Sequence, residues 1–187
     1  MKSTHRTQAK AKRSQRTHYV MTYGLLDTLF ASPDAPMPAE KRRHQLTRMY
    51  GGLRAMETAP APTRDDWRVV SDAVNLMETL VKEMRLCEDS SGLLDDAVKA
   101  LAIAGARHVE TGAAIRLDCA GIHAVRSVLE DYAAMLETLS ERTMTECHRL
   151  TERRGHEILR GVRQPHDVVV TAIWPPSPLT KNCWSRL

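Results

Sequence analysis

Apolar positions recur at helical spacing over most of this chain, most clearly between residues 65 and 84. There they fall three or four positions apart and therefore on one helix face. This face comprises Trp67, Val70, Val74, Met77, Leu80, Val81 and Met84. Thr63 and Asp66 have the spacing of a capping box, which favours a helix N-terminus at this point. The pattern predicts a helix that starts just after Thr63 and buries one face.

Two further helices are expected before this one. One apolar stripe predicts a helix from Tyr19 to Phe30, which the prolines that follow would end. Its members are Val20, Tyr23, Leu26, Leu29 and Phe30. Leu46, Met49, Leu53 and Met56 form the apolar face of a second helix, expected from Pro38 to Met56. Gly51-Gly52 lies inside it, and each glycine costs up to about 1 kcal/mol in a helix interior, so we expect a kink or an early stop there.

Two helices are also expected in the second half of the chain. The first follows the turn at residues 88–92, with Ser90 or Ser91 as its cap, and ends around Thr111-Gly112. The second runs to Arg154 from Ile115 or Ala120, and its apolar residues have heptad spacing. They are Val125, Leu129, Tyr132, Leu136 and Leu139. From Ala120 this helix would span roughly 52 Å and form the spine of the fold.

The character of the chain changes after Gly155. Residues 167–174 are a β-branched apolar run between prolines, which favours a strand, but the sequence offers no second strand to pair with it. We expect this run to pack as extended chain on the helices, to pair with itself across a dimer, or to contact a partner. The contact residues would be Val168, Val170, Ile173 and Trp174.

The predicted fold is therefore all-α: a bundle of about five helices with a long C-terminal helix. Residues 18–160 are expected to form the helical domain, residues 1–17 a basic flexible arm and residues 161–187 an extended tail. The composition agrees, because 42% hydrophobic and 27% charged residues are ordinary globular usage and exclude a disordered or collagen-like chain. No apolar run approaches the roughly 18 residues that a membrane span requires.

Charge is unevenly distributed along the chain. The net charge is +4, but residues 1–18 carry +6 without an acid and residues 153–187 carry +4, which leaves −6 for residues 19–152. Such a body is not a uniformly basic nucleic-acid binder, so phosphate contacts are expected only at the ends.

The N-terminal arm is the strongest functional feature of the sequence. Its cations can neutralise phosphates by counterion release, and an adjacent aromatic ring can stack on a base. The residues expected to contact nucleic acid are Lys10, Lys12, Arg13, Arg16 and Tyr19. The alternative is a tail that only improves solubility. The arm has no apolar face to insert into a membrane.

Motifs for catalysis or metal binding are weak. The sequence has no GxSxG elbow, no glycine-rich phosphate loop and no HExxH. Cys119 and His123 share one helix face, and His148, Glu152 and His156 share another. On one continuous helix the two sets would lie roughly 38 Å apart and could not share an ion. We expect no enzyme, no cofactor and no small-molecule substrate, with a metal-dependent enzyme as a third alternative.

Four scattered cysteines without a CxxC pair are typical of reduced thiols in a cytoplasmic protein. Three short segments add a resemblance: Lys10-Ala-Lys-Arg-Ser-Gln-Arg16, Asp65-Asp-Trp67 and Asp72-Ala-Val-Asn-Leu-Met-Glu78. Through them, residues from about 8 to 105 resemble small proteins encoded in prophages and plasmids of proteobacteria. Those proteins have no established activity, so the resemblance implies a mobile-element, cytoplasmic setting and gives no residue a role.

Two functions are consistent with these observations. In the first, the protein is an accessory or regulatory protein of a mobile element that contacts nucleic acid through its arm. This predicts salt-sensitive, largely sequence-independent binding that is lost when residues 1–17 are deleted. In the second, the acidic helical body is a protein-interaction module, such as a phage-type inhibitor, an adaptor of a host complex or a homodimer. Its contacts would come from the long helix and residues 168–174.

Overall fold

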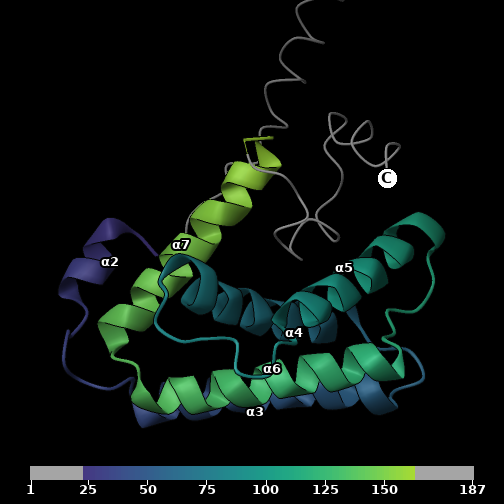
Figure 1. Cartoon of the computed structure of the whole chain (residues 1–187), viewed down its shortest axis with the longest axis horizontal. Helices are drawn as coiled ribbons and strands as arrows, with labels where there is room; N and C mark the ends of the chain where they lie inside the picture. The colour runs from purple at the N-terminus through teal and green to yellow at the C-terminus, as the bar shows by residue number, and fades with distance from the viewer. Residues whose placement is uncertain (1–22, 163–187) are drawn as a thin grey trace, which may run out of the picture.

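The computed structural model describes residues 23–162, and within that range it confirms the all-α fold (Figure 1). Its elements are α2 (Leu25–Phe30), α3 (Ala39–Thr58), α4 (Arg64–Glu78), the π-helical turn η1 (Thr79–Glu83), α5 (Leu94–Thr111), α6 (Cys119–Thr138) and α7 (Glu141–Leu159). No helix in these residues combines the length and the apolar character needed to cross a bilayer. The predicted arm at 1–17 and the apolar run at 167–174 lie outside the described residues.

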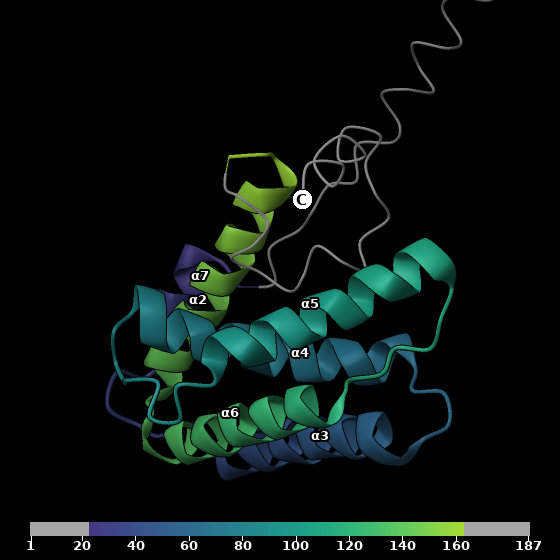
Figure 2. The same cartoon turned by 45° about the vertical axis from the view of Figure 1, so that its right-hand side comes forward.

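The central element of the bundle is α4, which packs against α3, α5, α6 and α7. Figures 1 and 2 show α3 and α6 side by side in one layer, and α4 and α5 form a second layer that is stacked on it. At one end of this bundle α7 diverges from the other helices, and α2 packs along it. The described chain is therefore a four-helix bundle with the α2–α7 pair attached at one end.

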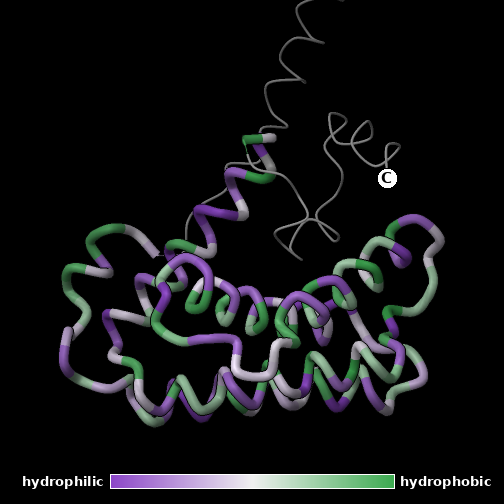
Figure 3. Tube along the Cα trace, in the orientation of Figure 1, coloured by the Kyte–Doolittle hydropathy of each residue, from purple (hydrophilic) through white to green (hydrophobic). Residues whose placement is uncertain are grey.

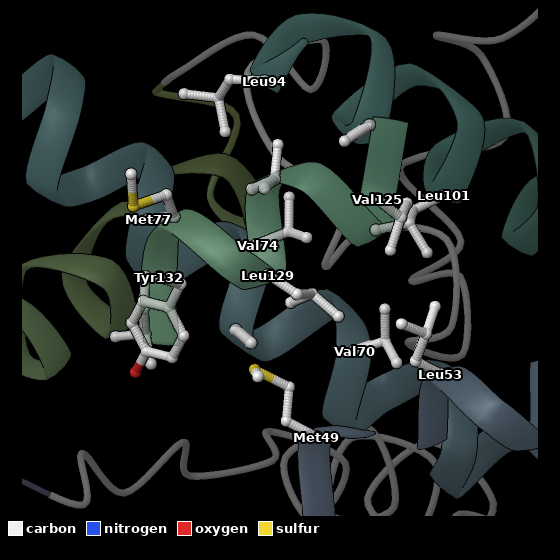
Figure 4. Close-up of a cluster of buried hydrophobic side chains, with 14 of the residues drawn as sticks. Met49, Leu53, Val70, Val74, Met77, Leu94, Leu101, Val125, Leu129 and Tyr132 are labelled. Atoms are coloured by element: carbon white, nitrogen blue, oxygen red, sulfur yellow. The ribbon is translucent and has the colours of Figure 1, made fainter. Parts of the chain in front are cut away.

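The apolar face predicted for residues 65–84 is the centre of the core. Trp67, Val70, Val74, Met77 and Leu80 are each at most 3% exposed. Figure 4 shows this face meeting apolar side chains from α3, α5 and α6, and Figure 3 shows how apolar positions recur along the helices. The Trp67 indole also donates a hydrogen bond from Nε1 to the Leu101 carbonyl oxygen, at 3.1 Å. The one polar group of this buried ring is thus satisfied.

The capping box predicted at the start of α4 is confirmed. The Asp66 amide donates to the Thr63 hydroxyl (3.2 Å), and the Thr63 amide donates to the Asp66 carboxylate (2.9 Å). At its other end α4 continues into η1, where the Met84 amide bonds to the carbonyl oxygen of Thr79, five residues earlier. The apolar spacing predicted this segment as helix, but it did not predict the wider π-helical turn.

The two glycines inside α3 do not end the helix, which continues to Thr58. A Cβ atom on Gly52 would lie 2.8 Å from the Asp66 carbonyl oxygen and 3.2 Å from Cγ2 of Val70. Gly52 therefore lets α3 approach the backbone of α4 closely. The expectation of an early stop is wrong because packing against α4 offsets the intrinsic cost of glycine in a helix.

The single helix expected over residues 120–154 is also wrong, because the chain breaks at Leu139 and Ser140. Leu139 is extended, with ψ at 141°, and Ser140 caps a new helix. The Ser140 hydroxyl accepts a hydrogen bond from the Thr143 amide at 3.2 Å. Serine followed by a first-turn glutamate is a helix-start signal that the heptad spacing before it obscured. The helices α6 and α7 are therefore separate, and α7 continues past Arg154 to Leu159.

The loop at residues 31–37 stabilises this break from outside. The Met37 amide donates to the Leu139 carbonyl oxygen (3.4 Å), and the Glu141 amide donates to the Ala35 carbonyl oxygen (3.0 Å). Backbone groups that a continuous helix would have satisfied internally are satisfied here by the loop. The break thus depends on a segment about a hundred residues earlier in the chain.

The boundaries of α5 agree with the prediction, but its cap does not. The helix starts at Leu94, and Gly112 follows its end in the left-handed conformation, with φ at 71°. Neither serine at 90–91 caps it. The Asp89 carboxylate accepts the Leu94 amide instead, at 3.1 Å. Asp89 thus reaches the first amide of the helix, whereas the Ser91 hydroxyl accepts the amide of Leu93, at 3.3 Å.

Candidate functional site

The long helix expected to contribute partner contacts is divided into α6 and α7, and the individual residues expected to contact a nucleic acid or a partner lie outside the described range. They are Lys10, Lys12, Arg13, Arg16 and Tyr19 on one side, and Val168, Val170, Ile173 and Trp174 on the other. Residues 23–162 carry two other surface features with functional character: an apolar face on α2, and a cleft between α3, α4 and α7.

The apolar side chains of α2 are exposed to solvent. Four of them form what we call the α2 patch: Leu25 (62% exposed), Leu26 (64%), Leu29 (61%) and Phe30 (84%). Of the stripe predicted over residues 19–30, Leu26, Leu29 and Phe30 lie on α2. The helix starts at Leu25 after an extended Gly24, so Tyr23 lies outside it, and no residue of α2 is buried. Helical spacing identified the face, but spacing alone does not show what covers it.

Polar contacts hold α2 against α7. The Arg142 guanidinium donates to the carbonyl oxygens of Ala31 (3.0 Å) and Leu29 (3.3 Å). The Thr28 hydroxyl donates to the Glu146 carboxylate at 3.4 Å. These bonds fix the short helix without burying the α2 patch.

A cleft of about 360 Å³ lies between α3, α4 and α7. Apart from Thr145, the buried part of its lining is apolar and rich in methionine: Met37, Met49, Ala73, Leu76 and Met144. Gln45 also lines the cleft and donates a hydrogen bond to the buried hydroxyl of Tyr132. Because methionine side chains adapt to differently shaped neighbours, this floor suits an apolar ligand group.

Charged side chains surround the mouth of the cleft. Lys41, His44 and Arg48 follow each other along α3 at intervals of three and four residues, which places them on one face. Lys41 also pairs with Glu141 at the start of α7, with 2.9 Å between Nζ and Oε1. The hydrogen bond and charge of Glu141 raise the pKa of Lys41. This ion pair links two walls of the cleft.

Tyr23 and His148 line a further part of the cleft. Their rings stack with centroids 4.9 Å apart and an interplanar angle of 25°. The Tyr23 amide donates to the Glu152 carboxylate at 3.3 Å, which fixes the chain just before α2. Burial lowers the pKa of His148, against the opposing charge of Glu152, and so favours a neutral imidazole.

Asp72 of α4 is the carboxylate of the cleft without an ion-pair partner within residues 23–162. The side chain of Asp72 is exposed to solvent, and partial desolvation by the surrounding protein raises its pKa to about 6. The charges of Arg68 and Arg48 oppose the shift. A carboxyl group with a raised pKa at the edge of a cleft is a feature that binding sites often share.

The potential metal ligands of the sequence are not brought together. Cys119 and His123 lie at the start of α6, and His148, Glu152 and His156 lie on α7. The continuous helix expected to carry both sets does not exist. Within the described range no three His, Cys, Asp or Glu side chains are grouped as a metal ion would need.

Comparison with known proteins identifies no relative: no family model, no curated protein and no solved structure matches this chain. The resemblance to prophage and plasmid proteins therefore stays a prediction. The α2 patch, the cleft and the distribution of charge are the features from which a function can be inferred.

Proposed function

We propose that this protein is an interaction module, an adaptor or inhibitor, that binds a partner protein on the α2 patch. The supporting observation is that four large apolar side chains, each more than 60% exposed, lie within the six residues of one helix. Single exposed apolar residues are common on protein surfaces, but a contiguous cluster is typical of a docking surface.

Charge defines the chemistry of the partner. Residues 1–18 carry +6 and end seven positions before Leu25, so the cations and the α2 patch can reach one partner. A protein segment with an apolar face flanked by acidic residues would cover the patch and pair with the arm. Its ionic contacts would be Lys10, Lys12, Arg13 and Arg16.

The proposal is tested by site-specific photo-crosslinking in cells that express the full chain. A photoreactive amino acid in place of Phe30 is expected to form an adduct with one acidic protein. The same group in place of Ile103 on α5, which is 64% exposed but outside the patch, is the matched control and should form none. Adding Leu26→Ser to the first variant should weaken the adduct because it removes apolar surface. No adduct at position 30, or an adduct only with a second copy of this chain, overturns the proposal.

The second candidate function is nucleic-acid contact through the arm, and the separation of charge favours it. The +6 of residues 1–18 adjoins a segment, 19–152, that carries −6. A polyanion would be attracted by the arm and repelled by most of the body, so the arm alone would supply the phosphate contacts. Binding of this kind is independent of sequence and weakens steeply with salt.

Salt titrations with a short duplex DNA and a single-stranded RNA distinguish this candidate. Changing both Lys12 and Arg13 to Gln is expected to reduce the slope of log affinity against log salt by about 2, because each lost phosphate contact removes nearly one unit. The matched control removes the same charge from exposed positions of α3, Arg43→Gln with Arg54→Gln, and should leave the slope nearly unchanged. An unchanged slope in the arm variant eliminates the arm as a nucleic-acid site.

A further inference from the structure

The chain leaves α7 close to the α2 patch, because α2 runs antiparallel to α7. The carbonyl oxygen of Ala31 accepts a hydrogen bond from Arg142, near the start of α7, whereas the amide of Tyr23 donates to Glu152, near its end. The N-terminal end of α2 therefore lies level with Glu152, about 10 Å along α7 from its last residue, Leu159. The chain that follows α7 starts within short reach of the patch.

A glycine turn ends α7 and redirects the chain. Gly161 is left-handed, with φ at 72°. Its amide donates to the Ile158 carbonyl oxygen, and the Val162 amide donates to the Glu157 carbonyl oxygen, both at 2.9 Å. These bonds form a Schellman motif, which terminates a helix and turns the chain away from its axis. Residues 163–167 can then span roughly 17 Å, more than the return to the near end of α2 requires.

Of the two ends of the chain, only the C-terminal one carries large apolar residues in a row. Residues 1–18 contain no Val, Ile, Leu, Phe, Tyr or Trp, whereas residues 168–174 are Val-Val-Val-Thr-Ala-Ile-Trp. Residues 23–162 form no β-strand that could pair with this run. An apolar run and an apolar patch joined by a short linker meet at an effective concentration of roughly millimolar. The run is thus the segment of this chain best suited to cover the patch.

We propose that residues 168–174 dock on the α2 patch and cover it until a partner displaces them. In an extended chain alternate side chains share a face, which brings Val168, Val170 and Trp174 to the patch together. Seven extended residues span roughly 23 Å, whereas the six residues of α2 rise about 9 Å. The competition with a partner rests on the proposed docking function, but the contact within the chain does not.

Photo-crosslinking in the purified full chain tests the contact. A photoreactive amino acid in place of Phe30 is expected to crosslink to residues 168–174, as located by mass spectrometry. The same group in place of Ile103 should form no crosslink there, and in place of Trp174 it should crosslink to residues 25–30. Mixing ¹⁵N-labelled and unlabelled chains identifies crosslinks between copies. No crosslink between the two segments, or crosslinks only between copies, overturns the proposal.

Aspartate at neighbouring positions of the run separates its two faces. Val170→Asp places a charge against the patch and is expected to remove most of the crosslink from position 30, because burying an unpaired carboxylate is costly. Thr171→Asp adds the same charge one position later, on the opposite face of an extended chain, and should retain the crosslink. Equal losses in the two variants would contradict the proposed docking.

The same two variants test the competition in cells. The partner adduct at position 30 is expected to increase at least about twofold in Val170→Asp relative to Thr171→Asp, because the apparent affinity for a partner scales with the fraction of molecules whose patch is free. An equal adduct in both variants overturns the competition and leaves the docking function standing. No partner adduct in either variant overturns the docking function, whereas the crosslink in the purified chain is independent of that result.

Discussion

Gly51 and Gly52 are neighbours in α3, but only one of them is needed for packing. A side chain on Gly52 would overlap the backbone of α4, whereas a Cβ on Gly51 would have no neighbouring atom within 4 Å. Gly51 therefore carries the entropic cost of glycine in a helix without a compensating contact.

Alanine at each position should separate the two effects. Gly52→Ala is expected to lower the free energy of unfolding by about 1–3 kcal/mol, the usual cost of overpacking. Gly51→Ala is expected to raise it by up to about 1 kcal/mol. Urea denaturation of both variants measures these changes. Equal effects at the two positions would show that α3 and α4 are not in close contact at Gly52.

Arg154 and Glu78 form an ion pair in the interior of the protein. Its Nη2–Oε2 distance is 2.8 Å, and the side chains are 3% and 1% exposed. Arg154 also donates to the Asn75 carbonyl oxygen at 3.2 Å and lies 3.7 Å from the Glu83 carboxylate. Buried charges are tolerated when they are paired, and losing one partner is costly because the other stays desolvated.

Glu78 also pairs with Lys82, at 3.1 Å, and keeps this partner when Arg154 is replaced. Arg154→Met is therefore expected to lower the free energy of unfolding by about 3 kcal/mol, the low end for a broken buried pair. Adding Glu78→Gln should restore part of this loss, because the double variant buries neither charge. A double-mutant cycle based on urea denaturation measures the coupling. Strictly additive losses would mean that the two side chains do not stabilise each other.

Most helices could be predicted from local signals. Residues 63–66 carry the capping box that starts α4, and Gly112 has the left-handed conformation that ends α5. The apolar spacing does not predict the division between α6 and α7, because it runs up to Leu139 without interruption. What decides the break is the Ser140 cap together with backbone bonds from residues 31–37, and the second of these has no local signal.

The cap of α7 can be tested directly. Ser140→Ala is expected to lower the free energy of unfolding by about 1 kcal/mol because it removes the acceptor for the Thr143 amide. Ser140→Asp, which keeps an acceptor at the cap, is expected to retain most of the stability. Thermal and urea denaturation of both variants give the comparison. If alanine and aspartate behave alike, the hydroxyl does not maintain the break.

The cleft and the exposure of the α2 patch belong to the assembled molecule, so the sequence predicts the apolar residues of the patch but neither their exposure nor the cleft. Lys41, His44 and Arg48 form a stripe that is visible in the sequence, but spacing does not show which helix faces it. Asp72 and His148 come from α4 and α7, far along the chain, and meet the stripe only in the fold. The nucleic-acid and partner contacts predicted for the ends lie outside residues 23–162 and stay predictions.

Cys147 connects the divergent helix α7 to the core of the bundle. Its side chain is completely buried, and its thiol lies 3.4 Å from the Leu76 carbonyl oxygen. Burial raises the pKa of this thiol to about 12. Cys119, the first residue of α6, is exposed. A reagent can therefore reach Cys119 in the folded protein, whereas the chain around Cys147 must unfold before a reagent can reach that thiol.

Thiol labelling can show whether α7 unfolds together with the bundle. In a variant that keeps only Cys147, with serine at Cys87, Cys119 and Cys183, labelling is expected to be at least about a thousandfold slower than in the variant that keeps only Cys119. The reason is that a thiol reactive only after global unfolding is protected by the whole free energy of unfolding. The ratio of the two labelling rates, converted to a free energy, should equal the free energy of unfolding that urea denaturation gives for the Cys147 variant. A smaller ratio of labelling rates would mean that the α2–α7 pair separates from α4 while the other helices stay folded. The molecule would then consist of two cooperative units.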